Sequence, residues 1–289
     1  MANVFITGAG GGFGLLTVQQ LIRDGHKVVG TVRDMSGRNK AKTMDLEKLG
    51  TKVVEMDVTD EASVDSAIKK AQELMGSVDV LINNAGVGVL GLTEAFTTAD
   101  VKKVFDVNVF GVHRVMRAVL PEMRKRSKGL VINVSSLLGR MTVPFYGPYN
   151  ATKWALEGLT ENYRTEVSQF GVEVCIVEPG GYPTTFMDNL VRASDKERAK
   201  EYGPMADMAE GFLKGFEQAL ASNSAQDPNH VAQAIGKLIS SSHGARPFRT
   251  IIDNMGMGSH LSEYNAHLGQ ITEAIYKNFG IAHLLKVKS

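Results

Sequence analysis

The chain of 289 residues has a single cysteine, Cys175, so it cannot form a disulfide bond within itself. This scarcity predicts a reducing compartment. The formal net charge is only +1, which gives no electrostatic reason to bind nucleic acid or an anionic membrane surface. No run approaches the roughly 18 apolar residues that a membrane-spanning helix needs, and the N-terminal segment lacks the pattern of a secretion signal. We therefore expect a cytoplasmic protein without nucleic-acid or membrane partners.

Histidine does not occur in any pattern that would bind a metal. The seven histidines are scattered, and none lies at ligand spacing from cysteine or carboxylate residues. Cys175 lies inside an apolar segment, which is typical of a small buried side chain rather than a nucleophile. The sequence therefore predicts no metal site.

What the chain does have is a regular alternation of short apolar runs and longer amphipathic segments. The runs are rich in Val and Ile, as in parallel strands that are buried on both faces. They predict strands at 3–7, 27–32, 52–56, 78–83, 129–135, 172–178 and 249–253. The segments between them predict helices near 14–24, 38–49, 61–75, 99–126, 150–170 and 229–241. We expect an α/β fold with one Rossmann-type domain over 1–289, a doubly wound parallel sheet of about seven strands and helices on both faces.

Two segments depart from this alternation. Residues 185–226 carry no strand signal, and residues 254–289 lie beyond the last predicted strand. The first segment contains an apolar stripe at helical spacing, formed by Met205, Met208, Phe212 and Phe216. Such a stripe fits a mobile flap over a substrate and fits equally a helix packed on its own sheet. We expect a substrate flap insertion at 185–226 and a C-terminal extension at 254–289, which would modify a subunit interface or cap the pocket.

The first predicted strand ends in a glycine-rich turn, TGAGGGFG, from Thr7 to Gly14. Between positions 8 and 12 only Ala9 carries a side chain, which removes bulk where a backbone must approach a diphosphate. The helix that follows offers free N–H groups and the positive end of its dipole. This strand–turn–helix context predicts a nucleotide site.

The spacing Gly8-x-x-x-Gly12-x-Gly14 is where the sequence begins to resemble the short-chain dehydrogenase/reductase family. Further motifs of that family follow in order over residues 1–184, and more loosely to 253. They are Asp57, NNAG (83–86), Asn108 in FDVNVFG, Ser136 in NVSS, YNATK (149–153) and PGGYPT (179–184). The resemblance implies that a dinucleotide is bound by Thr7, Gly8, Gly10, Gly12, Phe13, Gly14, Arg33, Asp57, Val58, Asn84, Ala85, Gly86, Tyr149, Lys153, Pro179, Gly180 and Thr184.

The end of the second predicted strand, GTVRD, bears on the choice of cofactor. An acidic residue there would bind an unmodified adenosine ribose and repel a 2′-phosphate. Val32 occupies this position, and the guanidinium of Arg33, which follows it, can bind a 2′-phosphate bidentately. NADP(H) is therefore favoured. A register shift of one or two residues would place Asp34 there instead, and the glycine turn has no basic residue, so NAD(H) stays open as the alternative.

Ketone reduction needs a hydride at carbon and a proton at the developing alkoxide. Tyr149 and Lys153 are one helical turn apart, and a lysine charge would lower the pKa of a phenol from its usual value near 10. We therefore assign Tyr149 as general acid/base and Lys153 as the residue that lowers its pKa and binds the nicotinamide ribose. Ser136 would hydrogen-bond the substrate oxygen. The family resemblance adds Asn108, which would hold a water that links Lys153 to solvent.

Each of these residues could also have a purely structural role; Tyr149, for example, could anchor a helix start after Pro148. The family motifs, which occur in order along the chain, favour the catalytic role. Tyr146 is the rival phenol, but Gly147 and Pro148 interrupt a helix that would carry it. We expect the substrate to be bound by Ser136, Tyr146, Tyr149, Tyr182 and Phe186.

The sequence thus predicts an oxidoreductase that acts on a hydrophobic ketone or alcohol, in the manner of a carbonyl reductase or alcohol dehydrogenase. It resembles the hydroxysteroid/retinol dehydrogenase and carbonyl reductase branch, so an NAD-dependent enzyme of that type is the alternative. An epimerase or dehydratase of the extended branch and a redox-silent NAD(P) sensor are further alternatives, although a sensor would not need Ser136, Tyr149 and Lys153 together. In the family, helices equivalent to 99–126 and 150–170 form a subunit interface, which implies a homodimer or homotetramer.

Overall fold

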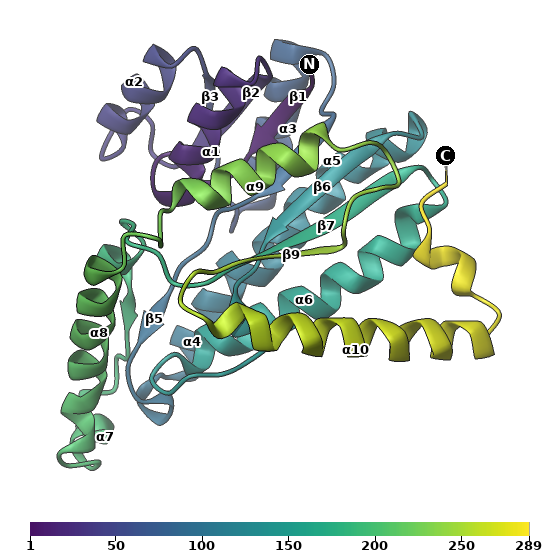
Figure 1. The fold of residues 1–289 in the computed structure, drawn as a ribbon. Coiled ribbons are helices and arrows are strands. Elements are labelled where there is room, and N and C mark those ends of the chain that lie inside the picture. The colour runs from purple at the N-terminus through teal and green to yellow at the C-terminus, as the bar shows by residue number, and fades with distance from the viewer. Residues whose placement is uncertain (289) are drawn as a thin grey trace.

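A computed structural model describes residues 1–288. Its centre is one parallel sheet of seven strands in the order β3-β2-β1-β4-β6-β7-β9, which confirms the predicted doubly wound α/β fold (Figure 1). The strands are β1 (Asn3–Ile6), β2 (Lys27–Val32), β3 (Lys52–Glu55), β4 (Val80–Asn83), β6 (Gly129–Val134), β7 (Val172–Pro179) and β9 (Arg249–Ile252). The chain builds outward from β1 in one direction and then from β4 in the other. The crevice at this reversal, at the carboxyl ends of the strands, is where open α/β sheets bind ligands.

Helices cover both faces because successive strand residues point to opposite sides of the sheet. In β1, Val4 and Ile6 enter the core beneath one helical layer, while Phe5 enters the other. The first layer consists of α1 (Gly12–Arg23), α2 (Lys40–Lys48) and α9 (Asn229–Ser240). The second consists of α3 (Glu61–Met75), α5 (Val112–Lys125) and α6 (Gly147–Ser168).

The predicted helix 99–126 is interrupted by a wider turn. It consists of α4 (Thr98–Phe105), a π-helical turn η2 (Asp106–Gly111) and α5, and Asn108 lies within the π turn. A sequence pattern of period 3.6 does not reveal such a turn, and π turns in helices often mark functional sites.

The segment 185–226 contains a short strand, although its sequence carries no strand signal. In it, β8 (Val191–Arg192) pairs in parallel with β5 (Val89–Leu90), and two-residue strands are too short to give a periodic signal. Helices α7 (Lys196–Lys200) and α8 (Met205–Ser222) follow. A third apolar cluster forms here, and it includes Val89, Leu90, Phe145, Tyr146, Tyr149, Ala193, Ala209 and Leu213. The segment therefore packs on the start of the helix that carries Tyr149.

The C-terminal segment begins with a long helix, α10 (Met257–Asn278), which runs across the lower part of the molecule in Figure 1 and is followed by η5 (Ala282–Leu285). The Nη2 atom of Arg164 donates to the Leu285 carbonyl at 3.2 Å, and Lys288 N donates to the Ser168 carbonyl at 2.9 Å. The predicted extension 254–289 is thus fastened to the far end of α6, and its last residue lies outside the described residues. None of the helices within residues 1–288 is long and apolar enough to cross a bilayer.

Candidate active site

A cavity of about 760 Å³ opens at the carboxyl ends of the central strands. Its wall comes from the glycine turn after β1, the segments that follow β2, β4, β6 and β7, the first turns of α6, and α8. The sheet therefore gathers the motifs that are dispersed along the sequence into one site.

The glycine turn leaves room that no other residue type would leave. Gly8 and Gly12 have φ angles of +67° and +51°, a region that favours glycine. A Cβ atom on Gly14 would lie 2.2 Å from the Gly8 carbonyl oxygen, so Gly14 lets α1 begin directly under the turn. Gly10 and Gly11 line the cavity above it. This cradle fits the diphosphate of a dinucleotide, which needs close backbone approach and a helix N-terminus.

The NNAG segment holds this turn in place. The hydroxyl of Thr7 accepts hydrogen bonds from Asn84 N at 3.0 Å and Ala85 N at 2.9 Å. The side chain of Asn84 donates to the carbonyls of Thr7 and Gly8 at 3.0 and 3.1 Å. Asn84, Ala85 and Gly86 line the cavity, whereas Thr7 lies buried behind its wall.

The end of β2 presents basic rather than acidic groups to the cavity. Val32 and Arg33 both lie in its wall. The Asp34 carboxylate accepts a hydrogen bond from Arg38 N at 3.0 Å within its own loop, and Asp34 is not part of the wall. The same loop places Arg38 in the cavity wall.

Sequence reasoning missed three further residues at this end of the cavity, Arg38, Asn39 and Lys42. A Cβ on Gly10 would lie 3.3 Å from Cδ of Lys42, so this lysine passes directly over the glycine turn. The basic group that the turn itself lacks is thus supplied from α2. Its only signal in the sequence was a cluster of basic residues after the second strand.

Asp57 and Val58 follow β3. Val58 lines the cavity, but Asp57 lies outside its wall and accepts hydrogen bonds from Thr59 N at 2.9 Å and Thr59 Oγ1 at 2.8 Å. Partial burial opposes ionisation of Asp57, yet the Thr59 hydrogen bonds and the nearby Arg33 hold its pKa below the ordinary value. Asp57 therefore orders the loop after β3.

The segment after β7 forms the opposite wall. Pro179, Gly180 and Thr184 line the cavity together with Phe13 from α1. The ring of Phe13 meets that of Tyr182 edge to face, with centroids 5.5 Å apart. These contacts join the glycine turn to the segment that the family places at the nicotinamide.

The catalytic helix α6 begins at Gly147, with Pro148 in its first turn and Tyr146 just before it. Tyr149 and Lys153 are both buried and both line the cavity. The Nζ atom of Lys153 donates to the Val134 carbonyl at 2.9 Å and lies 5.5 Å from the centroid of the Tyr149 ring. The phenol and the ammonium are therefore neighbours at the edge of the cavity.

Burial dominates the electrostatics of this pair. It raises the pKa of Tyr149, an effect opposed by a hydrogen bond with Ser136 and reinforced by Tyr146. Burial lowers the pKa of Lys153 to about 8, against the opposing effect of the Glu157 carboxylate. In the protein alone, Tyr149 is thus a neutral phenol that can donate a proton, and the lowering of its pKa expected from Lys153 does not outweigh burial.

Ser136 and Asn108 fix the surroundings of the pair. Ser136 lines the cavity, and its Oγ accepts a hydrogen bond from Leu138 N at 3.1 Å at the start of η3 (Leu137–Gly139). Asn108 lies behind the wall, where its amide donates to the Val87 carbonyl and accepts from Val87 N, both at 2.9 Å. Its Nδ2 atom also donates to Thr152 at 3.1 Å. Asn108 thereby ties the segment after β4 to α6.

The remaining wall is aromatic. Phe186 meets the Tyr149 ring edge to face at 5.8 Å, and Tyr146 and Tyr182 also line the cavity. The Tyr146 hydroxyl is buried without a hydrogen-bond partner among residues 1–288, and burial raises its pKa. Phe212 of α8 lies 6.3 Å from Tyr146, between ring centroids.

Only the C-terminal half of the apolar stripe on α8 reaches the cavity. Phe212 and Phe216 line the cavity, whereas Met205 and Met208 are 44% and 56% exposed. A Cβ on Gly181 would lie 2.1 Å from the Phe216 ring, so α8 rests directly on the segment after β7. The helix both packs on the protein and covers part of the cavity.

No group of three or more His, Cys, Asp or Glu side chains in residues 1–288 is placed to hold a metal ion. Cys175 is buried in β7, and burial raises the pKa of its thiol to about 12. A thiol in this environment stays protonated and is a poor nucleophile.

Comparison with known proteins agrees with this geometry. A family model described as short chain dehydrogenase matches residues 2–195. The chain is 36% identical over 249 residues to a 3-ketodihydrosphingosine reductase of Bacteroides thetaiotaomicron, covering 86% of each chain. It is also 36% identical over 253 residues to retinol dehydrogenase 8 of Bos taurus, covering 85% of this chain and 79% of that one.

Solved structures share the fold over most of the chain. A short-chain dehydrogenase from Streptomyces avermitilis superposes with a TM-score of 0.76 at 29% identity, covering 96% of this chain and 99% of that one. A short-chain dehydrogenase/reductase from Burkholderia phymatum in complex with NAD gives 0.72 at 27% identity, covering 86% and 88%. An actinorhodin polyketide ketoreductase with NADPH gives 0.73 at 26% identity, covering 89% and 97%. Relatives of this fold thus bind either nicotinamide cofactor.

Proposed function

The chain belongs to the short-chain dehydrogenase family, and from this premise we propose that it transfers a hydride between NADP(H) and a hydrophobic ketone or secondary alcohol. One observation carries the proposal. Tyr149 and Lys153, one helical turn apart and both buried, share with Ser136 the wall of a cavity that begins at a glycine cradle. A redox-silent sensor would need the cradle but not this pair.

The residues present fit each part of the reaction. A bound nicotinamide cofactor would supply the hydride in ketone reduction and accept it in alcohol oxidation. Tyr149, held as a neutral phenol, gives its proton to the substrate oxygen, and Ser136 donates a hydrogen bond to that oxygen. In alcohol oxidation the proton returns to a Tyr149 phenolate, which the Lys153 ammonium stabilises. Asn108 would hold the water that links Lys153 to solvent.

The residues proposed to hold the cofactor line the cavity, except Thr7, Gly14 and Asp57. The glycine cradle would bind the diphosphate, and Lys153 would bind the nicotinamide ribose. Arg33, Arg38 and Lys42 support NADP(H), because their positive groups suit a 2′-phosphate and Asp34 is engaged elsewhere. NAD(H) use, as in a hydroxysteroid- or retinol-type dehydrogenase, is the second candidate and rests on the acidic Asp34 in the same loop.

The substrate is proposed to be bulky and apolar. Phe186, Phe212, Phe216 and Met187 line the same cavity as Tyr149 and offer no charge to a polar substrate. Relatives named for ketodihydrosphingosine and retinol support the same class. Residues 185–226 would act as the substrate flap and 254–289 as the extension of a single domain. The cytoplasmic location and a homodimer or homotetramer remain predictions from the sequence.

The test follows NADPH absorbance against a panel of hydrophobic ketones, with NADH in parallel. We expect consumption of NADPH with at least one ketone. Tyr149→Phe should lower kcat by ~10²–10⁴-fold, the contribution of a general acid. Tyr146→Phe is the matched control, since this phenol lines the same cavity, and it should keep kcat within a few fold. Retained turnover in Tyr149→Phe would overturn the assignment, and no oxidation with any carbonyl would favour the sensor.

A further inference from the structure

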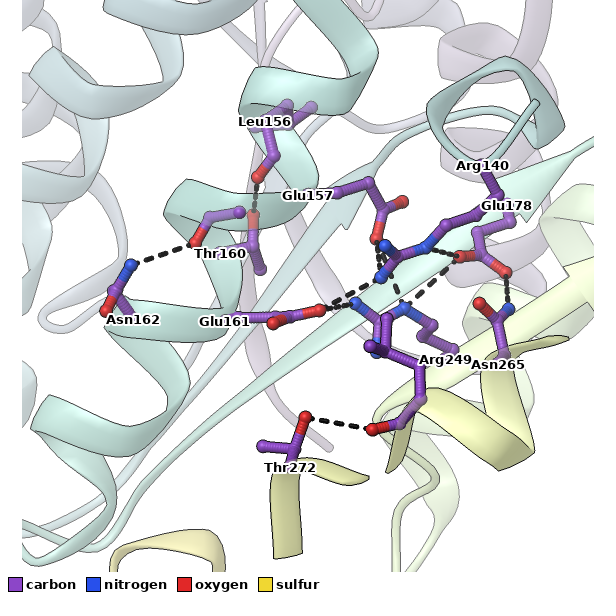
Figure 2. Close-up of polar contacts among 12 residues, drawn as sticks. Arg140, Leu156, Glu157, Thr160, Glu161, Asn162, Glu178, Arg249, Asn265 and Thr272 are labelled. Carbon is purple, nitrogen blue, oxygen red and sulfur yellow. Dashed lines mark hydrogen bonds and ion pairs between the residues drawn. The ribbon is translucent and has the colours of Figure 1, made fainter. Parts of the chain in front are cut away.

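A group of buried charges, which we call the carboxylate cluster, lies beside the catalytic helix (Figure 2). It consists of Glu157 and Glu161 of α6, Glu178 of β7, Arg140 after η3, and Arg249 of β9. Glu157 is 1% exposed and Glu178 is fully buried. An ionised carboxylate at such a buried position costs free energy unless it is paired, so the charges around each carboxylate decide its protonation.

Two guanidinium groups hold the buried carboxylates. Arg140 Nη2 lies 3.0 Å and Arg249 Nε 3.2 Å from the same oxygen of Glu157. The same arginines lie 3.5 and 3.3 Å from Oε1 of Glu178. Asn265, reaching in from α10, donates to the other oxygen of Glu178 at 2.7 Å. Segments far apart in the chain therefore meet at this pair.

The cluster contains more carboxylates than guanidinium groups. Glu161, whose side chain is 34% exposed, also pairs with both arginines, so three carboxylates share two guanidiniums. Oε1 of Glu157 has no hydrogen-bond partner among residues 1–288, and Oε1 of Glu178 has only its two ion pairs with the arginines. Burial and the neighbouring Glu178 raise the pKa of Glu157 to about 8, so a proton on Glu157 balances the cluster at lower pH.

A buried cation on the same helix is Lys153. It lies one turn before Glu157 on α6, at the spacing where lysine and glutamate side chains interact. Its ammonium is buried, and the Glu157 carboxylate raises the pKa of Lys153 while burial lowers it. An ionised Glu157 therefore favours the charged form of Lys153, which is the form that the reaction needs.

The cluster also contacts the segment that carries Ser136. A Cβ on Gly139 would lie 2.9 Å from Cγ of Glu157 and 2.9 Å from Oγ of Ser135, so Gly139 permits Glu157 to pack against this segment. Arg140 is the next residue. The same carboxylate is thus fixed by the strand end that positions the catalytic serine.

Given the proposed function, we propose that Glu157 is a positioning residue that acts through Lys153. Its carboxylate, held between Arg140 and Arg249, supplies the negative charge that keeps the Lys153 ammonium protonated beside Tyr149. Burial and the neighbouring Glu178 raise the pKa of Glu157. Glu157 therefore loses its proton and becomes negatively charged over the pH range in which Lys153 would otherwise lose its own proton.

The test is Glu157→Gln, which keeps the shape and removes the charge. Alcohol oxidation should decline at high pH as Lys153 deprotonates, and in this variant the decline should move about one pH unit lower, because Lys153 has lost its counter-charge. A second readout needs no substrate. The dissociation constant of NADPH, measured by fluorescence across the same pH range, should rise at a correspondingly lower pH.

Two control variants separate charge from shape. Glu166→Gln removes an exposed carboxylate from the same helix, outside the cluster, and should leave both profiles in place, whereas Glu157→Asp keeps the charge and should behave like the wild type. An unshifted NADPH-binding profile in Glu157→Gln overturns the inference. A wild-type protein that binds NADPH but turns over no ketone or alcohol overturns the proposed function alone. The NADPH-binding profile would still test the role of Glu157. If Glu157→Gln does not fold, Glu178→Gln should move both profiles to higher pH, because Glu157 ionises more readily without its neighbouring carboxylate, and a profile that stays in place or moves lower overturns the inference.

Discussion

At the scale of single residues, proximity in the chain decided what could be predicted. Tyr149 and Lys153 are four positions apart, so helix geometry alone places them together. Arg38 and Lys42 could not be assigned to the cavity, because their position depends on a loop in which Asp34 adopts a φ of +50° and caps Arg38. The direction of the Tyr149 pKa shift could not be predicted either, since burial decides it.

Arg33→Ala and Lys42→Ala test the basic end of the cavity. Each should raise the KM for NADPH by about tenfold or more, because a charge-assisted hydrogen bond contributes ~1.5–3 kcal/mol. The KM for NADH should change by less than about twofold, since NADH has no 2′-phosphate to lose a partner. Arg23→Ala, at the exposed end of α1 and outside the cavity, is the control for a general loss of positive charge. Equal effects on both cofactors would contradict the assignment.

At the scale of elements, the long buried strands and amphipathic helices followed from periodicity. The two-residue strands β5 and β8 and the π turn at Asn108 did not, because they depend on tertiary contacts rather than on a repeating pattern. Whether the α8 stripe was a flap or a packed helix also needed the structure, in which Phe216 rests on Gly181.

Gly181→Ala tests the contact between α8 and the segment after β7. The added Cβ would lie 2.1 Å from the Phe216 ring, so α8 must move and the KM for a hydrophobic ketone should rise severalfold. The double variant with Phe216→Ala should recover part of this loss, as expected for residues in direct contact. Gly215→Ala on the same helix meets nothing within 4 Å and should leave the KM unchanged. A purely additive double variant would show that the two residues do not act on each other.

At the scale of the whole molecule, buried carboxylates link stability to pH. Burial and Glu178 raise the pKa of Glu157 to about 8, well above its value in an unfolded chain. A group shifted in this direction stabilises the fold below the unfolded pKa, and that stabilisation is lost as the pH rises through the folded pKa. No sequence pattern predicts this linkage, because Glu157 and Glu178 lie on different elements and meet only in the folded chain.

The free energy of unfolding, measured with urea, should therefore fall by about 1–3 kcal/mol between pH 5 and pH 8. Glu157→Gln should flatten this decline, because the variant has no carboxyl group to ionise at that position. Glu47→Gln, on the exposed face of α2, should keep the wild-type slope. A stability that rises over this pH range would contradict the direction given for Glu157.

The central claim is hydride transfer from a nicotinamide to a ketone bound beside Tyr149, and isotope transfer measures it most directly. The protein would be incubated with NADPH dideuterated at nicotinamide C4 and a hydrophobic ketone, and the alcohol analysed by mass spectrometry. We predict one deuterium on the carbinol carbon of each product molecule, and no product above background with Tyr149→Phe. Unlabelled alcohol, or unchanged ketone across the whole panel while NADPH is bound, would contradict the account.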